Sequence, residues 1–386
     1  MTRRSLILSL LFLLLALLLS APRMSSVKPL APIDISSDLS NHLVLITGGT
    51  SGVGLEAAKN FASRGARVVL TGRAVLRAQA AAGALVARSE GLLPHVGLQL
   101  DLTVPASIRA FLESLRPLLA QTPKLKAAIL NAGLVPPPDY AGAWSVGGFP
   151  GGPVDRMVAA NHLGHCMLLD DSALSGAISA NAARLVFVSS ISSHLATAED
   201  TLPENLVNPI GGREGAALGV SGLARMFSHY GTTKLLNLLT ANKLSREFAA
   251  AGSGATAVAV TPGFAATAIG NKDRSFGLPS PLDYVPLAFS AAEGGEMLVR
   301  AAAVDAALVR DRLLQPYWIW EGADAVFGTG PAKGVFHNLF QEIVTQKIGR
   351  GVYAHKQSVV ATDEAVQDRV REWSLSMLGN QQPPGQ

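Results

Sequence analysis

The 386-residue chain has few of the residues that build disulfides and metal centres. It contains one cysteine, Cys166, which excludes an intramolecular disulfide and a metal site made of several cysteines. We interpret this thiol as a small buried apolar group. The sequence has no H-E-x-x-H pattern, and His162, His165, His194 and His229 lack a ligand spacing that also brings in acids. We therefore expect these histidines to pack or to support other side chains, and we expect no metal.

Other features that the chain lacks argue against further classes of protein. The net charge is only +4, and no dense run of lysine and arginine is interleaved with aromatic residues, so nucleic-acid binding has little support. The serine-rich run 189–193 has no G-x-S-x-G context, which argues against a serine hydrolase. No internal repeat of fixed period is visible. The apolar fraction of 48% is that of a globular protein of one large or two average domains.

The N-terminus holds a long apolar run. Residues 6–19 are almost wholly Leu, Ile, Phe and Ala, and the 17 residues from Ser5 to Ala21 are about the minimum for a membrane-spanning helix. A cleaved signal peptide needs small residues at positions −3 and −1, but Leu18 or Leu19 would stand at −3. We therefore favour an uncleaved membrane anchor over residues 1–22, with the endoplasmic reticulum as one candidate membrane. A signal peptide or an organelle-targeting segment is the alternative.

Strands and helices alternate after a proline- and serine-rich linker at 23–40, within a single domain over residues 41–375. Apolar runs predict strands at 43–46, 66–71, 96–100, 126–130, 184–189 and 255–260. Helical patterns follow at 55–61, 74–88, 105–119, 154–169 and 230–250. Repeated strand–helix units with nearly continuous apolar strands predict an α/β fold, a Rossmann-like doubly wound parallel sheet covered by helices on both faces.

The segments outside these units are expected to cover the substrate or to lie on the surface. The glycine-rich insertion 201–222 and the region 270–350 are predicted to cover the pocket, because loops of this kind lie over the site. A further strand is expected near Gly351–Tyr353, and residues 376–386 form a tail. Asp170–Asp171 is interpreted as a solvated helix end.

The turn after the first strand, Thr47–Gly54, has the spacing T-G-x-x-x-G-x-G and leads into a helix. Glycines let the backbone turn sharply and approach a pyrophosphate closely, and the N–H groups of a helix's first turn attract the phosphate charge. The turn is therefore predicted to bind a dinucleotide. The residues expected to bind it are Gly48, Thr50, Ser51, Gly52, Val53 and Gly54.

The second strand ends at Thr71-Gly72-Arg73, where the chain faces the adenosine ribose in folds of this kind. An acid at this place binds the 2′-hydroxyl of NAD, whereas a basic residue accepts the 2′-phosphate of NADP. Because Arg73 is present and an acid is absent, charge matching favours NADP(H), with Arg77 as a helper. An ordinary solvated arginine is the alternative.

Tyr230 and Lys234 are four residues apart, which on a helix means the same face and one turn between them. An adjacent ammonium and a cationic nicotinamide lower the pKa of a phenol from about 10, so Tyr230 is predicted to act as acid and base. Lys234 would also hold the nicotinamide ribose. Ser190 ends the fifth strand at the sheet edge where ligands bind, and its hydroxyl can hold a substrate carbonyl.

Together these motifs resemble the short-chain dehydrogenase/reductase family, in the family's order from about residue 47 to 267. In that family the second serine of such a pair is catalytic, which implies Ser190 rather than its neighbour Ser189. The segment Asn161–His165, N-H-L-G-H, is similar to the family helix whose asparagine holds a water in the proton relay. The resemblance therefore implies a catalytic set of Asn161, Ser190, Tyr230 and Lys234.

The same resemblance implies further contacts with the cofactor. Asp101 and Leu102 close the third strand, where the family holds the adenine edge. Asn131-Ala132-Gly133 is similar to the N-A-G segment, whose backbone lies against the cofactor. Pro262, Gly263 and Thr267 follow the sixth strand and resemble the segment that borders the nicotinamide.

The N-H-L-G-H segment and the T-G-R strand end place the resemblance closest to the branch of retinol dehydrogenases and light-dependent protochlorophyllide reductases. It implies an NADP(H)-dependent enzyme that moves a hydride between nicotinamide and a carbonyl or alcohol. The apolar N-terminus suggests a lipophilic substrate such as a retinoid, steroid or fatty carbonyl.

Two alternatives to this function are kept. The first is a protochlorophyllide reductase-like enzyme, although Phe264 stands where those enzymes carry a cysteine. The second is a non-catalytic NADP(H)-binding scaffold or sensor. The partners expected are the small-molecule substrate and the membrane, with a homodimer as an open alternative to a monomer.

Overall fold

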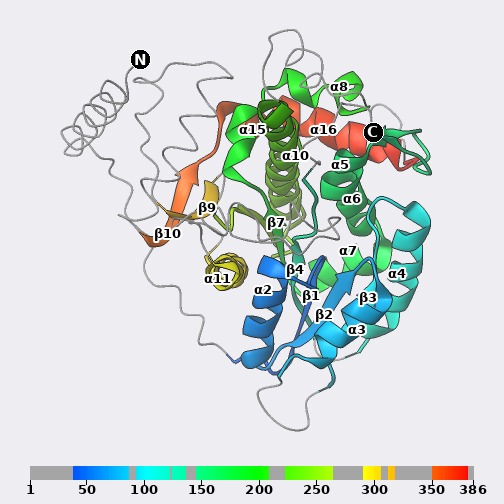
Figure 1. The fold of residues 1–386 in the computed structure, drawn as a ribbon, viewed down its shortest axis with the longest axis vertical. Helices are drawn as coiled ribbons and strands as arrows, with labels where there is room; N and C mark the ends of the chain where they lie inside the picture. The colour runs from blue at the N-terminus through cyan, green and yellow to red at the C-terminus, as the bar shows by residue number, and fades with distance from the viewer. Residues whose placement is uncertain are drawn as a thin grey trace, which may run out of the picture.

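The computed structural model describes residues 38–86, 93–121, 124–135, 145–207, 222–263, 290–305, 312–317 and 350–380. Its centre is an eight-stranded sheet with helices on both faces (Figure 1). In chain order the strands are β1 (His42–Ile46), β2 (Arg67–Gly72), β3 (Val96–Gln99), β4 (Lys124–Leu130), β7 (Arg184–Val188), β8 (Thr256–Val260), β9 (Arg312–Tyr317) and β10 (Arg350–Lys356). Their order across the sheet is β10-β9-β8-β7-β4-β1-β2-β3. The pairs are parallel except for β9 with β10. The predicted parallel sheet is confirmed, and the strand expected near 351–353 lies within antiparallel β10.

Helices cover the two faces of the sheet in two groups. One group is α2 (Gly52–Ser63), α3 (Val75–Gly83) and α11 (Ala291–Ala303), and the other is α4 (Pro105–Leu119), α6 (Gly164–Leu169), α7 (Ser172–Ala180) and α10 (Gly222–Ala251). Successive side chains of a strand point to opposite faces. Val44 and Ile46 therefore enter the core under the first group, whereas Leu43 and Leu45 enter the core under the second. Burial on both faces is why these strands are apolar runs rather than alternating patterns.

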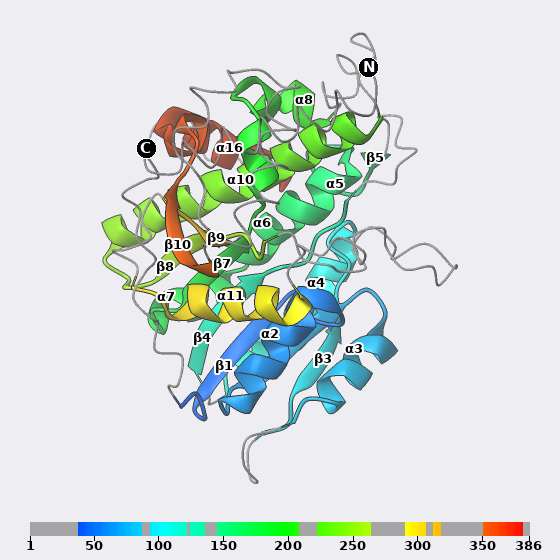
Figure 2. The same cartoon turned by 60° about the vertical axis from the view of Figure 1, so that its left-hand side comes forward.

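Helices α2 and α11 contact each other on one face of the sheet (Figure 2). A Cβ at Gly294 of α11 would come within 2.9 Å of Val53 Cγ2, and one at Gly295 within 2.7 Å of Ala57 N. Such distances are too short for a real Cβ, so glycine is required for this approach. Because Val53 belongs to the predicted cofactor turn, α11 helps to place that turn against the sheet.

The helix predicted over 154–169 was wrong at its start and in its regularity. Val154–Asp155 is a short strand, β6, which pairs with β5 (Ser145–Val146). Asp155 then caps α5 (Arg156–Val158), because its carboxylate accepts hydrogen bonds from the first backbone N–H groups of that helix. A π-helical turn, η2 (Ala159–Leu163), follows before α6 begins. π turns of this kind are frequent at functional sites, and this one carries Asn161.

Two other helices differ from the prediction at their ends. The helix expected at 230–250 begins at Gly222, so Tyr230 lies inside α10 rather than at its start. The helix expected at 74–88 ends at Gly83. The remaining short elements are η3 (Ile191–Leu195), η4 (Glu199–Thr201), α8 (Pro203–Val207) and α15 (Val359–Thr362).

The interpretation of Asp170–Asp171 as a solvated helix end is correct for the exposed Asp170, which caps the C-terminus of α6, and wrong for Asp171. Its carboxylate caps α7 by accepting hydrogen bonds from Ala173 N and Leu174 N, each at 3.0 Å. The same side chain pairs with Arg116 at 2.9 Å and is only 8% exposed. Asp171 therefore begins a helix instead of ending one in solvent.

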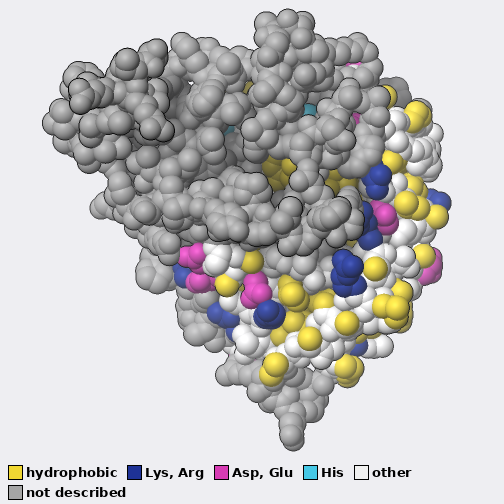
Figure 3. Space-filling model, in the orientation of Figure 1, with side chains coloured by type: hydrophobic (Ala, Val, Ile, Leu, Met, Phe, Trp, Pro, Cys, Tyr) yellow, Lys and Arg dark blue, Asp and Glu magenta, His cyan; other side chains and the backbone are white. Residues whose placement is uncertain are grey.

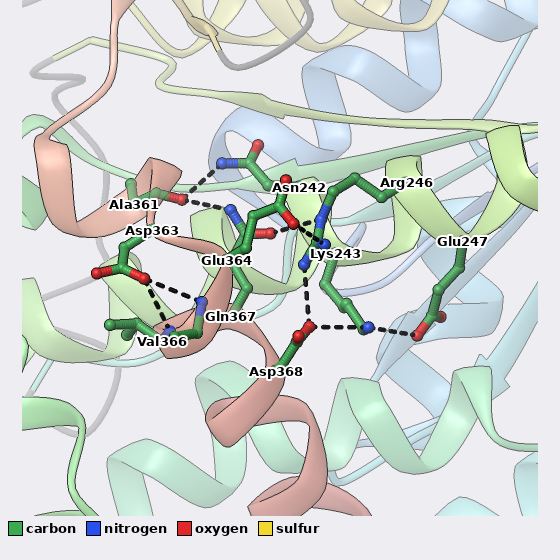
Figure 4. A network of polar contacts seen from close by, with 11 residues as sticks. Asn242, Lys243, Arg246, Glu247, Ala361, Asp363, Glu364, Val366, Gln367 and Asp368 are labelled. Carbon is green, nitrogen blue, oxygen red and sulfur yellow. Dashed lines mark hydrogen bonds and ion pairs between the residues drawn. The ribbon is translucent and has the colours of Figure 1, made fainter. Parts of the chain in front are cut away.

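The C-terminal helix α16 (Glu364–Met377) packs on α10 through a polar network (Figure 4). Arg246 of α10 donates to Gln367 at 3.0 Å and pairs with Glu364 at 2.7 Å and Asp368 at 2.9 Å. Lys243 Nζ lies 2.8 Å from the same Asp368 carboxylate. The last described helix of the chain is thereby held against the helix that carries Tyr230 and Lys234.

The domain was predicted to span residues 41–375, but residues just before and just after these limits also pack against the folded core. Leu39 is buried and donates its N–H to Arg64 O at 2.8 Å. Met377 is buried, and its carbonyl accepts a hydrogen bond from Gly151 N at 3.0 Å. The packed unit therefore reaches a few residues further at each end.

Several predictions fall on residues outside the described ranges. These are the segment 1–22, the linker before residue 38, Phe264 and Thr267, most of 201–222 and 270–350, and the tail from 381 onward. Within the ranges that the structure describes, no helix combines the length and the apolar character needed to cross a bilayer.

The described part of the surface in Figure 3 intersperses acidic, basic and apolar side chains. Large apolar side chains are exposed on and just after α3, among them Leu76 at 77% and Val86 at 81%. Single exposed apolar side chains are ordinary on soluble domains. The expectation that the chain binds no nucleic acid stays a prediction.

Candidate active site

The carboxyl ends of the parallel strands bring the predicted motifs to one edge of the sheet. In the register, Ile46 of β1 pairs with Ile129 of β4, and Phe187 of β7 pairs with Leu130. Val188 pairs in turn with Val260 of β8. The glycine turn, the N-A-G segment, Ser190 and Pro262 therefore leave the sheet at adjacent positions. This edge is where doubly wound folds bind their ligands.

The glycine turn has the backbone that a dinucleotide cradle needs. Gly48 and Gly52 have φ angles of +67° and +57°, in the left-handed region that favours glycine. A Cβ at Gly54 would lie 2.6 Å from Gly48 O and 2.5 Å from Asn131 Nδ2, so the third glycine is required by close packing. Ser51 begins α2 without a capping bond from its own side chain, so that side chain does not cover the first N–H groups of the helix. The turn therefore fits a phosphate group.

Thr50 and Gly72 join the cradle to the end of β2. A Cβ at Gly72 would lie 2.6 Å from Thr50 Cγ2. The next residue, Arg73, is exposed, and its carbonyl accepts a hydrogen bond from Gln99 Nε2 at 3.1 Å. Arg77 on α3 is also exposed. Both arginines are therefore exposed to solvent.

The N-A-G segment is tied to the glycine turn by hydrogen bonds that Thr47 accepts. Asn131 Nδ2 donates to Thr47 O, and Ala132 N donates to Thr47 Oγ1, each at 2.9 Å. A Cβ at Gly48 would lie 2.9 Å from Ala132 Cα, so these two turns are in direct contact. Thr47 was not among the predicted site residues, although its place as the first residue of T-G-x-x-x-G-x-G was a signal.

His165 links this network to the π-helical turn. Its Nε2 lies 2.9 Å from Thr47 Oγ1, and its Nδ1 lies 3.3 Å from Asn161 O. Burial lowers the pKa of His165 to about 4, so the ring is neutral near pH 7. Because a carbonyl only accepts, Nδ1 carries the proton and Thr47 donates to Nε2. His165 thus supports Asn161, as the sequence interpretation of the histidines expected.

Asn161 uses its carboxamide to join three parts of the site. Its Oδ1 accepts from Leu134 N at 2.7 Å, and its Nδ2 donates to Leu134 O at 3.0 Å. The same Nδ2 lies 3.0 Å from Thr233 Oγ1 on α10. Thr233 lies between Tyr230 and Lys234 in the sequence, and nothing in the motif pattern identified it as a partner.

Lys234 is buried at the centre of the predicted catalytic set. Its Nζ donates to Val188 O at 3.0 Å and lies 5.3 Å from the centre of the Tyr230 ring. A Cβ at Gly133 would lie 3.5 Å from Lys234 Nζ and 3.2 Å from Asn161 Oδ1, so these groups are close neighbours. Burial lowers the pKa of Lys234 to about 8, which leaves it largely protonated at pH 7.

Asn237 lies beside Lys234 in the site and was not among the predicted residues. Its Nδ2 donates to Val188 O at 3.1 Å, so it shares this acceptor with Lys234. It lies about one helical turn after Lys234 on α10, and that spacing is the signal that could have identified it.

The two serines after β7 have different surroundings. Ser189 is buried, and its hydroxyl donates to Lys234 O at 2.8 Å, which engages it in the packing of β7 on α10. Ser190 is partly exposed and caps η3, with its hydroxyl accepting a hydrogen bond from Ser192 N at 3.3 Å. An accepting hydroxyl still has a proton to donate. Ser190 is therefore kept as the serine proposed to orient a substrate oxygen.

The remaining predicted cofactor residues follow β3 and β8. Asp101 accepts hydrogen bonds from Thr103 N at 2.9 Å and Thr103 Oγ1 at 2.7 Å, and Leu102 is buried. Pro262 and Gly263 follow β8, and Gly263 has a φ of +82°. Thr267, which was expected to complete this segment, lies outside the described residues.

His162 and Cys166 are buried packing residues. His162 Nε2 lies 2.9 Å from Ser374 Oγ, and the imidazole stacks on Trp373 with ring centres 6.4 Å apart. Burial lowers the pKa of His162 to about 3 and raises that of the Cys166 thiol to about 11. An un-ionised, buried thiol is unreactive. The interpretations of His162 and Cys166 are confirmed.

Comparison with known proteins identifies the family and several relatives of this chain. The family model for short chain dehydrogenases matches residues 42–201. Human retinol dehydrogenase 11 is 33% identical over 260 residues, which cover 66% of this chain and 71% of that protein. The chloroplastic short-chain dehydrogenase TIC 32 A of Brassica napus is 31% identical over 239 residues, which cover 60% of this chain and 66% of that protein.

A solved structure shares the fold at lower identity. The crystal structure of an uncharacterised protein from Mycobacterium paratuberculosis has a TM-score of 0.59 and 22% identity, over 93% of this chain and 100% of that chain. Among the curated relatives, several are matched over only 55 to 66% of their own length. The chain belongs to the short-chain dehydrogenase/reductase family of oxidoreductases, in the branch that contains the retinol dehydrogenases.

Proposed function

We propose that the chain is an NADP(H)-dependent carbonyl reductase or alcohol dehydrogenase. The observation that carries this proposal is the position of Lys234, whose buried ammonium lies beside the Tyr230 ring, Gly133 and Asn161. An ammonium placed there favours the phenolate form of the tyrosine, so the phenol can exchange a proton near neutral pH. The presence of Ser190 and Tyr230 together with Lys234 argues against a scaffold that only binds a nucleotide.

Each residue of the set has one part in the proposed reaction. When bound, the nicotinamide cofactor supplies or accepts the hydride. Tyr230 passes the proton to or from the substrate oxygen, and Ser190 donates a hydrogen bond that orients that oxygen. Lys234 lowers the pKa of the Tyr230 phenol, so that the phenol can exchange a proton near neutral pH. Its ammonium donates one N–H to Val188 O and has further N–H groups for the nicotinamide ribose. Asn161 supports the proton relay.

The preference for NADP(H) is proposed from the exposed Arg73 at the end of β2. A guanidinium there can pair with the 2′-phosphate, which NADH lacks. Arg73→Ala should weaken NADPH binding by about tenfold to a hundredfold, the range of a charged hydrogen bond, and should change NADH binding little. Titration of both cofactors by fluorescence measures this, with Arg77→Ala as the matched control of smaller effect. Equal losses for the two cofactors would mean that Arg73 acts structurally.

The substrate class is proposed from the N-terminal segment and from the relatives. Several relatives are named retinol dehydrogenases, and another is named as chloroplastic. A chain held at a membrane by residues 1–22 meets lipophilic molecules, so we propose a retinoid, steroid or fatty carbonyl as substrate. A homodimer is compatible with this proposal and is tested by the mass of the purified protein in solution.

The experiment that tests the enzyme assignment is NADPH oxidation by purified protein against a panel of carbonyl compounds. Carbonyl-dependent oxidation is expected, with apolar aldehydes and ketones preferred. Tight NADPH binding without turnover of any carbonyl, or of any alcohol in the reverse direction with NADP⁺, would favour the scaffold or sensor. Reduction that requires light would favour the protochlorophyllide reductase-like alternative, against which Phe264 argues.

A further inference from the structure

A buried pair of ionisable side chains lies directly beside Tyr230. His229 Nε2 lies 2.9 Å from Asp155 Oδ1, and the two side chains are only 3% and 1% exposed. A carboxylate can only accept, so the imidazole donates this hydrogen bond. A buried carboxylate is stable only when it is paired and hydrogen-bonded, so this contact constrains both partners.

The same carboxylate oxygen also begins the helix that leads to Asn161. Asp155 Oδ1 accepts from Met157 N at 2.8 Å and from Val158 N at 3.0 Å. These N–H groups open α5, which continues without a break into the π-helical turn that contains Asn161. One oxygen atom therefore contacts both α10 and the start of the Asn161 segment.

A second bond joins the same two elements about one turn further along. Asn161 Nδ2 lies 3.0 Å from Thr233 Oγ1, and Thr233 Oγ1 in turn donates to Tyr230 O at 2.8 Å. The segment 155–161 thus contacts α10 at residues 229 and 233, on both sides of Tyr230. Two attachments that flank one residue fix both its position and its rotation about the helix axis.

We propose that Asp155 and His229 form a positioning pair that holds Tyr230 in register with Asn161. The proposal rests on the proposed function for its kinetic consequence, since the two residues act through Tyr230 and Asn161. Loss of the pair would displace the phenol from Lys234 and from the substrate oxygen, and a misplacement of about 1 Å can cost a factor on the order of a hundred in rate.

Two substitutions of Asp155 separate the pair from the helix cap. Serine and asparagine both cap helices well. Asp155→Ser keeps the cap, but its shorter side chain cannot reach His229. Asp155→Asn keeps the cap and an oxygen that can accept from His229 Nε2. The matched control is Asp171→Ser, because Asp171 also caps a helix, α7, while its other carboxylate oxygen pairs with Arg116.

We expect kcat to fall in Asp155→Ser and not in Asp155→Asn or Asp171→Ser. Asp155→Ser should lower kcat by about tenfold or more, with the KM for NADPH nearly unchanged. Its solvent deuterium isotope effect on kcat should rise, because the misplaced phenol transfers the proton more slowly. This ratio does not depend on the fraction of folded protein, so a purely structural loss would not move it. Asp155→Asn and Asp171→Ser should keep the kcat and the isotope effect of the unmodified protein.

A second measurement needs no turnover. Protein labelled with 3-fluorotyrosine gives a fluorine NMR resonance for Tyr230, assigned by its disappearance in Tyr230→Phe. Asp155→Ser should shift this resonance, and Asp155→Asn and Asp171→Ser should not. A resonance in Asp155→Ser that coincides with that of the unmodified protein overturns the proposal, whatever the kinetics show.

The two proposals fail in distinguishable ways. If no carbonyl is reduced by the unmodified protein, the proposed function fails, while the fluorine spectra still decide whether the pair positions Tyr230. If Asp155→Ser does not fold, His229→Phe removes the donor from the other side while it keeps an aromatic ring. A folded His229→Phe protein with an unchanged kcat and isotope effect would also overturn the pair.

Discussion

Lys234 illustrates how a single residue can serve the site at a cost to the fold. Burial lowers its pKa from the ordinary value of 10.5 to about 8, so near pH 7 the protein holds an ammonium in a buried place. Its Nζ has one fixed partner in Val188 O. A buried charge costs stability, and active sites commonly retain such costs for function.

Lys234→Met should therefore stabilise the protein at pH 7 by about 1–3 kcal/mol while it abolishes turnover. The folded pKa of Lys234 lies below the unfolded one, so the unfolded chain binds more protons between pH 8 and 10.5. The stability of the unmodified protein consequently rises with pH through this window, and the advantage of the variant shrinks. Urea unfolding at pH 7 and pH 10 measures both effects. A variant less stable than the unmodified protein at pH 7 would contradict this prediction.

Tyr230 is the residue on which the proposed chemistry depends most directly. Tyr230→Phe removes only the hydroxyl, and turnover should fall by about a hundredfold to ten-thousandfold, the usual effect of losing a general acid–base group. NADPH binding should persist, because the cradle of Gly48, Gly52 and Gly54 belongs to other elements. Steady-state kinetics and a fluorescence titration test the two statements. Near-normal turnover would remove Tyr230 from the mechanism.

At the scale of elements, the contact of α16 with α10 combines ion pairs with apolar burial. The Arg246 pairs lie at the surface, where each contributes at most about 1 kcal/mol and weakens in salt. Trp373 of α16 is instead buried in the main core and stacks on His162, next to Asn161. Burial of the indole is therefore the larger contribution to holding α16 in place.

Trp373→Ala should lower the free energy of unfolding by about 3–5 kcal/mol, because it removes a large buried side chain and leaves a cavity. Arg246→Ala should lower the free energy of unfolding by about 1 kcal/mol or less. This loss should be smaller in 1 M salt, where the Debye length is only about 3 Å and surface ion pairs are screened. Urea unfolding at low and high salt separates the two effects. Equal costs for the two variants would show that the polar network of Figure 4, not the apolar contact, holds the C-terminal helix.

At the scale of the whole molecule, the described contacts of the folded unit begin at Asp38, whose carboxylate accepts a hydrogen bond from Ser40 N at 3.0 Å. Leu39 N donates to Arg64 O, and Ser40 packs against Gly65, where a Cβ would lie 2.6 Å from Ser40 Oγ. A deletion that ends at residue 37 leaves these contacts intact. A deletion through residue 40 removes them.

The protein that begins at residue 38 should be soluble, folded and active on a water-soluble carbonyl, whereas the full chain should stay with membranes through an alkaline carbonate wash. Burial of the apolar run 6–19 at about 1.5–3 kcal/mol per large side chain would make insertion effectively irreversible. The deletion through residue 40 should be less stable by about 1–3 kcal/mol, since it loses buried Leu39. A mature N-terminus near Ala21 on a protein that is soluble in a lumen would contradict the anchor and leave the enzyme assignment untouched.

Local features of this protein were predictable from the sequence because they depend on periodicity and on the sterics of neighbouring residues. The runs at Leu43–Ile46 and Arg184–Val188 predicted strands, since a strand buried on both faces must be apolar throughout. The spacing of Gly48, Gly52 and Gly54 predicted a turn that only glycine can form. The four-residue interval between Tyr230 and Lys234 predicted a shared helix face.

Only the tertiary structure decided which polar groups are partners across the molecule. His229 lies 74 residues from Asp155, and Asn161 lies 72 residues from Thr233, so no local pattern relates them. The break in the predicted helix 154–169 has the same origin, because Asp155 both pairs as a strand residue and caps the helix that follows. A hydrogen bond forms only where packing brings a donor within about 3 Å of an acceptor, and that distance depends on the register of the sheet and the placement of helices on it. Sequence patterns specify the elements, whereas the contacts that position Tyr230, Lys234 and Asn161 exist only once those elements are packed.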